Sequence, residues 1–178
     1  MKKLFEVRRY YYYRVDKPSD GAFLNRDIEV RPISMENYCE IGSYNQALLP
    51  VFRSFLMHDN FGLYGYLNGK LVTYAWSILN KRSKCKRVRA FFPLPGNAAC
   101  VHYCRVLDEY QGRKIYQTML AYLYRALFQK VNFVYLDTEI SNVPAQRAIE
   151  KSGGQLQGML VRVMLMGKTV VTFKRVKR

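Results

Sequence analysis

The segment from Val106 to Gly154 constrains the fold more than any other part of this 178-residue chain. A short loop, Gln111–Tyr116, leads into an apolar helix pattern. A predicted strand, Phe133–Thr138, then leads into a second helix that begins near Asn142. A loop that enters a helix N-terminus presents backbone N–H groups and the positive end of the helix dipole to an anion. The segment therefore predicts a ligand with phosphate groups, held beside the ends of two neighbouring strands.

Strand signals dominate the first half of the chain. The stretch Leu4–Val15 is rich in Tyr and Phe and predicts a strand, and Asp27–Pro32 predicts a shorter one. Two apolar runs, Phe61–Leu67 and Leu71–Leu79, flank Asn68-Gly69. Asn-Gly favours a two-residue hairpin because both residues tolerate positive φ. Between these strands Ser34 offers a helix N-cap, and Tyr44–Met57 repeats apolar residues at helical spacing, with a break or kink expected at Pro50.

The second half alternates strands with helices. Ala98–Val106 predicts a strand with both faces covered, because polar and apolar residues alternate poorly along it. Ile115–Leu127 repeats apolar residues on one helix face. Met159–Met166 and Thr169–Val176 predict a terminal hairpin around Gly167-Lys168. These elements predict an α/β fold in one domain, residues 1–178, with a mixed sheet and helices on both faces.

Two motifs in the Val106–Gly154 segment resemble the GNAT N-acetyltransferase superfamily. The family loop runs Gln/Arg-x-x-Gly-x-Gly/Ala at the start of a helix and grips the pyrophosphate of acyl-coenzyme A. This chain matches at Gln111 but has Lys114 and Tyr116 where small residues are usual. The second family motif is an Asn followed by a helix that ends near Gly-Phe. Here it is matched by Asn142, Ala145, Glu150-Lys151 and Gly153, with Gly154 in place of the Phe.

The resemblance implies a fold and a cofactor. The fold would be a twisted mixed sheet of about seven strands with helices on both faces, with residues 1–20 as a Tyr-rich N-terminal strand extension. The cofactor would be acetyl-CoA, an acyl-CoA co-substrate, lying where the central strands Ala98–Val106 and Phe133–Thr138 splay apart. Val106 would bond the pantetheine arm through its main chain, and Asn142 would bond the same arm. The pyrophosphate would meet the N–H groups of Gly112, Arg113, Lys114, Ile115 and Tyr116.

Acyl transfer to an amine also needs a group that accepts a proton. His102 titrates near neutrality, and strand alternation places it on one face with Cys100 and Cys104. Glu139 ends the next strand, shares a face with Asp137, and is the second candidate. The tyrosine that often serves as general acid in the family is replaced by Ile149. Asp137 or Glu139 could instead hold a cationic amine. His102 and Asn142 each have an ordinary structural interpretation, as a partly buried histidine and as a helix N-cap alone.

Charge and cysteine usage limit the partners. The net charge of +16 favours an anionic partner, and it is densest at Lys81–Arg89 and Lys174–Arg178. No RNA-binding motif accompanies it, and no apolar run reaches the ~20 residues that span a bilayer. We therefore expect a cytoplasmic protein. The four cysteines form no CxxC and do not cluster with His at zinc-ligand spacing, so no metal is expected. The terminal hairpin and the first strand could pair a homodimer through a sheet edge.

The resemblance leaves three functions open. The first is acetyl transfer from acetyl-CoA to a small amine-bearing acceptor, such as an amino sugar or a nucleotide-linked amino sugar. The Gly-x-x-Ile-Tyr loop, with Cys104 two residues before Val106, is similar to GNAT members of bacterial surface-polysaccharide pathways. The second is acetylation of a protein or peptide amine. The third is a GNAT-fold protein that binds acyl-CoA without turnover, which the altered loop and the missing tyrosine keep open.

Overall fold

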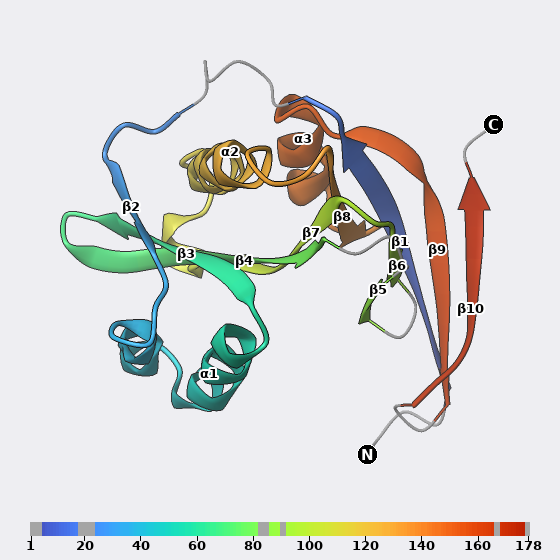
Figure 1. Ribbon diagram of the computed structural model, residues 1–178, viewed down its shortest axis with the longest axis horizontal. Coiled ribbons are helices and arrows are strands. Elements are labelled where there is room, and N and C mark those ends of the chain that lie inside the picture. Colours follow the sequence, from blue (N-terminus) through green and yellow to red (C-terminus); the bar gives the residue numbers. More distant parts are fainter. Residues whose placement is uncertain (1–4, 18–23, 82–85, 90–91, 166–167, 177–178) are drawn as a thin grey trace.

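The computed structural model describes residues 5–17, 24–81, 86–89, 92–165 and 168–176, with side chains for 5–17, 24–81 and 93–165. Within these residues eight strands form one mixed sheet, in the order β10-β9-β1-β8-β7-β4-β3-β2 (Figure 1). The strands of this sheet are β1 (Phe5–Val15), β2 (Ile28–Pro32), β3 (Asn60–Leu67), β4 (Lys70–Asn80), β7 (Ala98–Val106), β8 (Phe133–Glu139), β9 (Gln155–Leu165) and β10 (Lys168–Val176). A separate pair is formed by β5 (Lys86–Arg89) and β6 (Phe92–Leu94).

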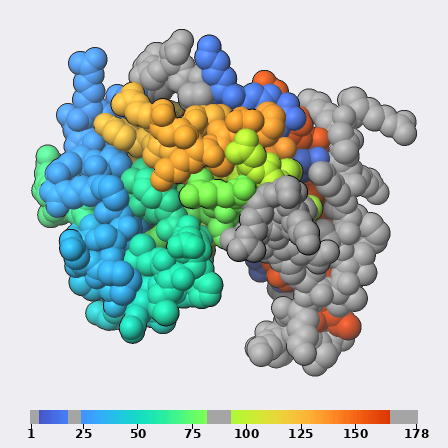
Figure 2. Space-filling view, viewed as in Figure 1, coloured from blue at the N-terminus to red at the C-terminus, as the bar shows by residue number. Residues whose placement is uncertain are grey.

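The helices lie on both sides of the sheet, and the predicted α/β class is confirmed. Helices α2 (Ile115–Leu127) and α3 (Val143–Lys151) cover one face, and α1 (Leu49–Met57) covers the other (Figure 1). Figure 2 shows the same arrangement on the surface, with α2 in orange above the sheet and α1 in teal below it. The short 3₁₀ turns are η1 (Tyr38–Ser43), η2 (Gln46–Leu48) and η3 (Asp108–Tyr110). None of the helices described is long and apolar enough to cross a membrane.

Local signals located several elements correctly. Helix α2 has the predicted bounds, Ile115 to Leu127. The hairpin between β3 and β4 turns at Asn68 and Gly69, whose φ angles are 50° and 74°. Positive φ at both positions is what a tight hairpin turn of right-handed twist requires, so the Asn-Gly prediction is confirmed.

The two central strands run parallel for only part of their length. The register between β7 and β8 extends from Ala98 beside Phe133 to Val101 beside Leu136. Beyond these pairs β7 stays on β4 as far as Val106, and β8 stays on β1 as far as Glu139. Beyond Val101 and Leu136, β7 therefore remains paired with β4 and β8 with β1, while β7 and β8 are no longer paired with each other. The sheet opens at this point, as the predicted cofactor position required.

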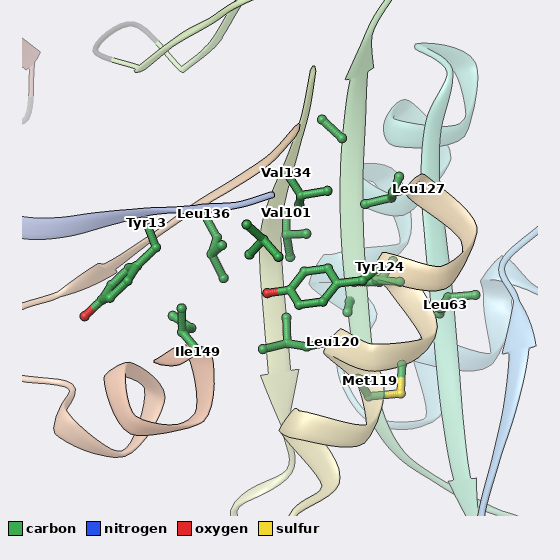
Figure 3. Close-up of a cluster of buried hydrophobic side chains, with 14 of the residues drawn as sticks. Tyr13, Leu63, Val101, Met119, Leu120, Tyr124, Leu127, Val134, Leu136 and Ile149 are labelled. Carbon is green, nitrogen blue, oxygen red and sulfur yellow. The ribbon is translucent and has the colours of Figure 1, made fainter. Parts of the chain in front are cut away.

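A core on the α2 and α3 side holds the paired halves of β7 and β8 together. Leu120 and Tyr124 of α2 and Ile149 of α3 point toward Val101 and Leu136 of the sheet (Figure 3). All five side chains are at most 3% exposed. Burying the four aliphatic side chains among them contributes roughly 1.5–3 kcal/mol each. This core therefore fixes the point at which the strands begin to diverge.

A second core of aromatic side chains lies on the α1 side. Phe52 of α1 is fully buried, and its ring centroid lies 5.0 Å from that of Trp76 and 5.1 Å from that of Tyr74. Both contacts are edge-to-face, the geometry that aromatic quadrupoles favour. This core anchors α1 under β3, β4 and β7.

Two expectations for the segment before α1 are wrong. No helix begins at Ser34. Its hydroxyl accepts the Glu36 N–H and its carbonyl accepts the Tyr38 N–H in a single turn, and the first 3₁₀ segment, η1, begins at Tyr38 without a side-chain cap. Helix α1 begins at Leu49 instead of Tyr44, and Pro50 lies in its first turn. Proline is tolerated there because those N–H groups have no intrahelical acceptor. The expected break therefore lies directly before Pro50, between η2 and α1, and the proline does not kink the helix.

The close approach of β3 and β4 gives a test of this packing. A Cβ at Gly62 would lie 2.6–2.8 Å from ring atoms of Trp76. Because Trp76 is fully buried, we expect Gly62→Ala to lower the free energy of unfolding by about 1–3 kcal/mol, measured by chemical denaturation. The control is Gly42→Ala, whose Cβ would meet the flexible Leu49 side chain at 3.3 Å. Equal stability of the two variants would contradict this packing.

Candidate active site

A cleft of about 800 Å³ opens where β7 and β8 separate. Its walls come from the ends of both strands, from the loop before α2, and from the first turns of α2 and α3. The lining residues include Val101–Val106, Tyr110–Gly112, Lys114–Gln117, Leu136–Glu139, Asn142, Ala145 and Ala148. The two sequence motifs, far apart in the chain, therefore meet in one cleft.

Backbone N–H groups without acceptors line one side of this cleft. In the described part of the chain, the amides of residues 112–117 donate no hydrogen bond, and the first bonded amide of the helix is that of Thr118, to the Lys114 carbonyl. Such amides carry the positive end of the helix dipole. The start of α2 can therefore bind an anion through several N–H groups at once.

Hydrogen bonds from both of its flanks hold the loop in place. The Asp108 carboxylate accepts a hydrogen bond from Gln111 Nε2 at 3.0 Å and one from Arg105 at 3.3 Å. On the other side, Asn25 donates from its side chain to the Arg113 carbonyl at 3.2 Å and from its backbone to the Thr118 hydroxyl at 2.9 Å. The loop thus has its shape before any ligand arrives.

Two residues of the loop adopt positive φ. Gly112 has φ 80°, and a Cβ built on it would meet nothing within 4 Å. A larger side chain at Gly112 would therefore extend into the open cleft without meeting other protein atoms. Lys114 is the N-cap of α2 and has φ 60° and ψ 12°, which is left-handed. Lysine is uncommon in this conformation, whereas glycine adopts it freely, which explains why a small residue is usual in the matching loop.

The side chains of Arg113 and Tyr116 differ in their position. Arg113 is exposed and does not line the cleft; its guanidinium lies 5.5 Å from the Tyr110 ring centroid. Its guanidinium is therefore not part of the cleft. Tyr116 is half-buried, lines the cleft, and packs against the α2 core. Burial raises the pKa of its hydroxyl well above the usual value, so the phenol stays protonated and can donate a hydrogen bond.

Asn142 lies in the cleft and caps α3. Its side-chain oxygen accepts the Ala145 N–H at 3.2 Å, and Pro144 occupies the first turn of the helix. The cap uses the oxygen, and the amide NH₂ of this cleft residue remains a donor. Both roles considered for Asn142 are therefore compatible in this geometry.

A bulge in β7 changes which side chains share a face. Tyr103 has φ 51°, and two residues of β7, Tyr103 and Cys104, stand opposite one residue of β4. As a result His102 and Tyr103 both pack on the α1 side, against Phe55, whereas Cys104 packs into the α2 core. The expectation that Cys100, His102 and Cys104 share one face is wrong for Cys104, because a bulge reverses the alternation.

The carboxylates of β8 lie on the same side as His102. Along β8, Val134, Leu136 and Thr138 are buried, which places Asp137 and Glu139 on the opposite face of the strand. Both carboxylates line the cleft. Glu139 is exposed and lies 3.6 Å from Arg8 of β1, so its charge is partly matched, while Asp137 is half-buried. The cleft thus joins two faces of the sheet: main-chain donors on the α2 side and titratable groups on the α1 side.

Other predicted features lie outside the cleft or outside the described residues. Ile149 occupies the position where the family often has its general-acid tyrosine. It is fully buried in the α2 and α3 core and does not line the cleft. The side chains of 82–92 and 166–178, which hold most of both basic clusters, are outside the described residues. Among the side chains described, no group of His, Cys, Asp and Glu is arranged to hold a metal ion.

The cleft thus combines the opening between two parallel strands with a row of main-chain amides at the start of α2. The family described as "Acetyltransferase (GNAT) family" matches residues 28–154, which include both motifs. The chain therefore belongs to the GNAT acetyltransferase family. No match was found among curated proteins.

Solved structures share the fold at low sequence identity. A GNAT-family acetyltransferase from Colwellia psychrerythraea is 16% identical with a TM-score of 0.67, over 97% of this chain and 57% of its own. A conserved protein of unknown function from Staphylococcus epidermidis is 17% identical with a TM-score of 0.62, over 87% and 60%. An aminoglycoside N-acetyltransferase in complex with CoA is 16% identical with a TM-score of 0.54, over 70% and 90%. The chain thus spans about 60% of the length of the first two.

The left-handed backbone at Lys114 leads to a stability prediction. Lys114→Gly and Lys114→Val remove the same charge, but only valine has a β-branched side chain that clashes at φ 60°. We expect the valine variant to be less stable than the glycine variant by about 1–2 kcal/mol, measured by denaturant unfolding. If valine were as stable as glycine, residue 114 would not be left-handed.

Proposed function

We propose that this protein is an N-acetyltransferase that moves an acetyl group from acetyl-CoA to the amine of a small acceptor. The pyrophosphate of the cofactor meets the unbonded amides of residues 112–116, and Gln111 flanks them. The pantetheine arm lies between the separated strands, beside Val106 and Asn142. The observation that carries this proposal is the coincidence of the strand opening with the row of amides in one cleft.

The opening through the sheet suits direct transfer. The thioester enters from the α2 side, and the amine approaches from the α1 side, where His102 and Tyr103 lie. His102 accepts the first proton, which the bound ammonium loses before attack. The neutral amine then attacks the thioester carbonyl, the C–S bond breaks, and CoA leaves as a thiolate that takes up the second proton from the attacking nitrogen. Glu139, which bridges to Arg8, and Asp137 supply negative charge that attracts a protonated amine to this side.

An amine-bearing sugar is the first acceptor class to test. The CoA complex with the same fold belongs to an aminoglycoside N-acetyltransferase, which acts on amine-bearing sugars. The comparisons contain no link to surface-polysaccharide pathways, so a nucleotide-linked sugar stays a prediction. Peptide amines are the second class, and a binding protein without turnover is the third. A cytoplasmic location and a homodimer also stay predictions.

Two glycines give a matched test of the cofactor grip. Gly112 and Gly69 have φ of 80° and 74°, and a Cβ on either meets nothing within 4 Å. Leucine is therefore strained equally at both, but only Gly112 lies in the cleft. We expect Gly112→Leu to weaken acetyl-CoA binding roughly tenfold or more, measured by calorimetry, and Gly69→Leu to leave it unchanged. Equal affinities in both variants would mean that the loop does not hold the cofactor.

Ligand-induced stabilisation and turnover complete the test. Acetyl-CoA at about 100 times its dissociation constant stabilises the folded state by about 2.7 kcal/mol, a rise in melting temperature of about 5–10 °C. Thiol release is then followed with amino sugars, peptides and small amines as acceptors. No thermal shift at millimolar acetyl-CoA would contradict the proposal. A shift without thiol release for any acceptor would favour the binding protein.

A further inference from the structure

Asn60, the first residue of β3, has a side-chain amide whose orientation is fixed by backbone carbonyls. Its Nδ2 lies 3.2 Å from the Phe55 carbonyl oxygen and 3.2 Å from the His58 carbonyl oxygen, both at the end of α1. A carbonyl oxygen accepts hydrogen bonds only, so the NH₂ group must face these two atoms. Turning the amide around would set its oxygen against two carbonyl oxygens. The Asn60 oxygen is therefore directed to its remaining neighbour.

That neighbour is the imidazole of His102. The Asn60 Oδ1 lies 2.9 Å from His102 Nε2. Because the oxygen cannot donate, Nε2 must carry the hydrogen. In the neutral ring the lone pair that can take a proton is then on Nδ1. The Asn60 amide thus places the hydrogen of the neutral His102 ring on Nε2.

Packing holds the ring where this hydrogen bond can form. The imidazole meets the Phe55 ring edge-to-face, with centroids 5.1 Å apart and an angle of 82° between the ring planes. The bulge at Tyr103 turns His102 and its neighbour together toward α1. Asn60 itself does not line the cleft, whereas His102 does. The contact therefore reaches the cleft only through the imidazole.

We propose that Asn60 is a positioning residue that fixes His102 in the Nε2–H tautomer, so that Nδ1 accepts the proton of the acceptor amine. This inference rests on the proposed transfer for its catalytic part. In the step, the amine N–H bond breaks, its electron pair stays on nitrogen, and the proton forms the Nδ1–H bond. The resulting imidazolium keeps its Nε2–H bond to Asn60. A neutral amide, unlike a carboxylate, supports this hydrogen bond without strongly favouring the charged ring beforehand.

The second histidine of the chain is an internal reference. The sequence contains two histidines, and His58 Nδ1 lies 2.7 Å from the Ser54 carbonyl oxygen. By the same reasoning His58 carries its hydrogen on Nδ1. The two rings are therefore expected in opposite tautomers. A single spectrum then tests both assignments.

The tautomers are read by long-range ¹H–¹⁵N NMR of protein with labelled histidine, above the titration range of both rings. His58→Gln assigns the signals. We expect the Nε2–H pattern for His102 and the Nδ1–H pattern for His58. A His102 signal with the Nδ1–H pattern, or an average of both tautomers, overturns the inference even if the protein transfers acetyl groups. The spectrum needs no substrate, so failure of the proposed function cannot produce this result.

Two variants of Asn60 test the positioning role. Asn60→Leu removes the acceptor and should release His102 into both tautomers, with kcat lowered about tenfold or more and KM for acetyl-CoA unchanged. Asn60→Asp keeps an acceptor and adds a charge, so the titration midpoint of His102 and the pH–rate profile should both move up by about 1 pH unit or more.

Melting curves show whether each variant is folded. An unchanged tautomer in folded Asn60→Leu, or a pH–rate profile that stays fixed while the His102 midpoint moves, overturns the positioning role. If no acceptor is found, the acetylation proposal fails. The NMR measurement of the His102 tautomer still decides whether Asn60 orients His102.

Discussion

The early separation of β7 from β8 is the constraint on which the rest of the site depends. The strands remain paired as far as Val101 and Leu136, which pack against α2 and α3, and they separate at the next residues. Each keeps its outer partner, β4 or β1, so the opening leaves both strands ordered. The residues at the start of α2 line the cleft formed by this opening, and the cleft connects the two faces of the sheet.

Local signals made much of the fold predictable. The apolar repeat fixed both ends of α2, Asn-Gly fixed the turn between β3 and β4, and Asn142 with Pro144 fixed the start of α3. Each depends on residues within one or two turns of each other. The loop proposed to bind phosphate could be located for the same reason, because loop, helix and cap are adjacent in sequence.

The chemistry of the α1 side could not be predicted in the same way. The bulge at Tyr103 comes from pairing with β4, and it placed Cys104 on the other face from His102. The contact between Asn60 and His102 joins residues 42 positions apart, on strands separated by β4, and no motif marks it. The left-handed backbone at Lys114 could have been predicted from the sequence, because Lys114 occupies a position where the family loop usually has a small residue.

The place of β1 in the sheet has a consequence for how the molecule is made. Residues 10–15 pair with residues 134–139 of β8, and the other edge of β1 pairs with β9. Contacts between segments so distant in sequence form slowly, because the chain loses conformational entropy before the pairing compensates for that loss. On the ribosome, residues 5–15 must therefore wait for residue 165 before both their edges are covered. During that interval a tyrosine-rich strand has unpaired edges that other nascent chains can meet, so a chaperone that covers residues 5–15 would protect the chain until β8 and β9 are made.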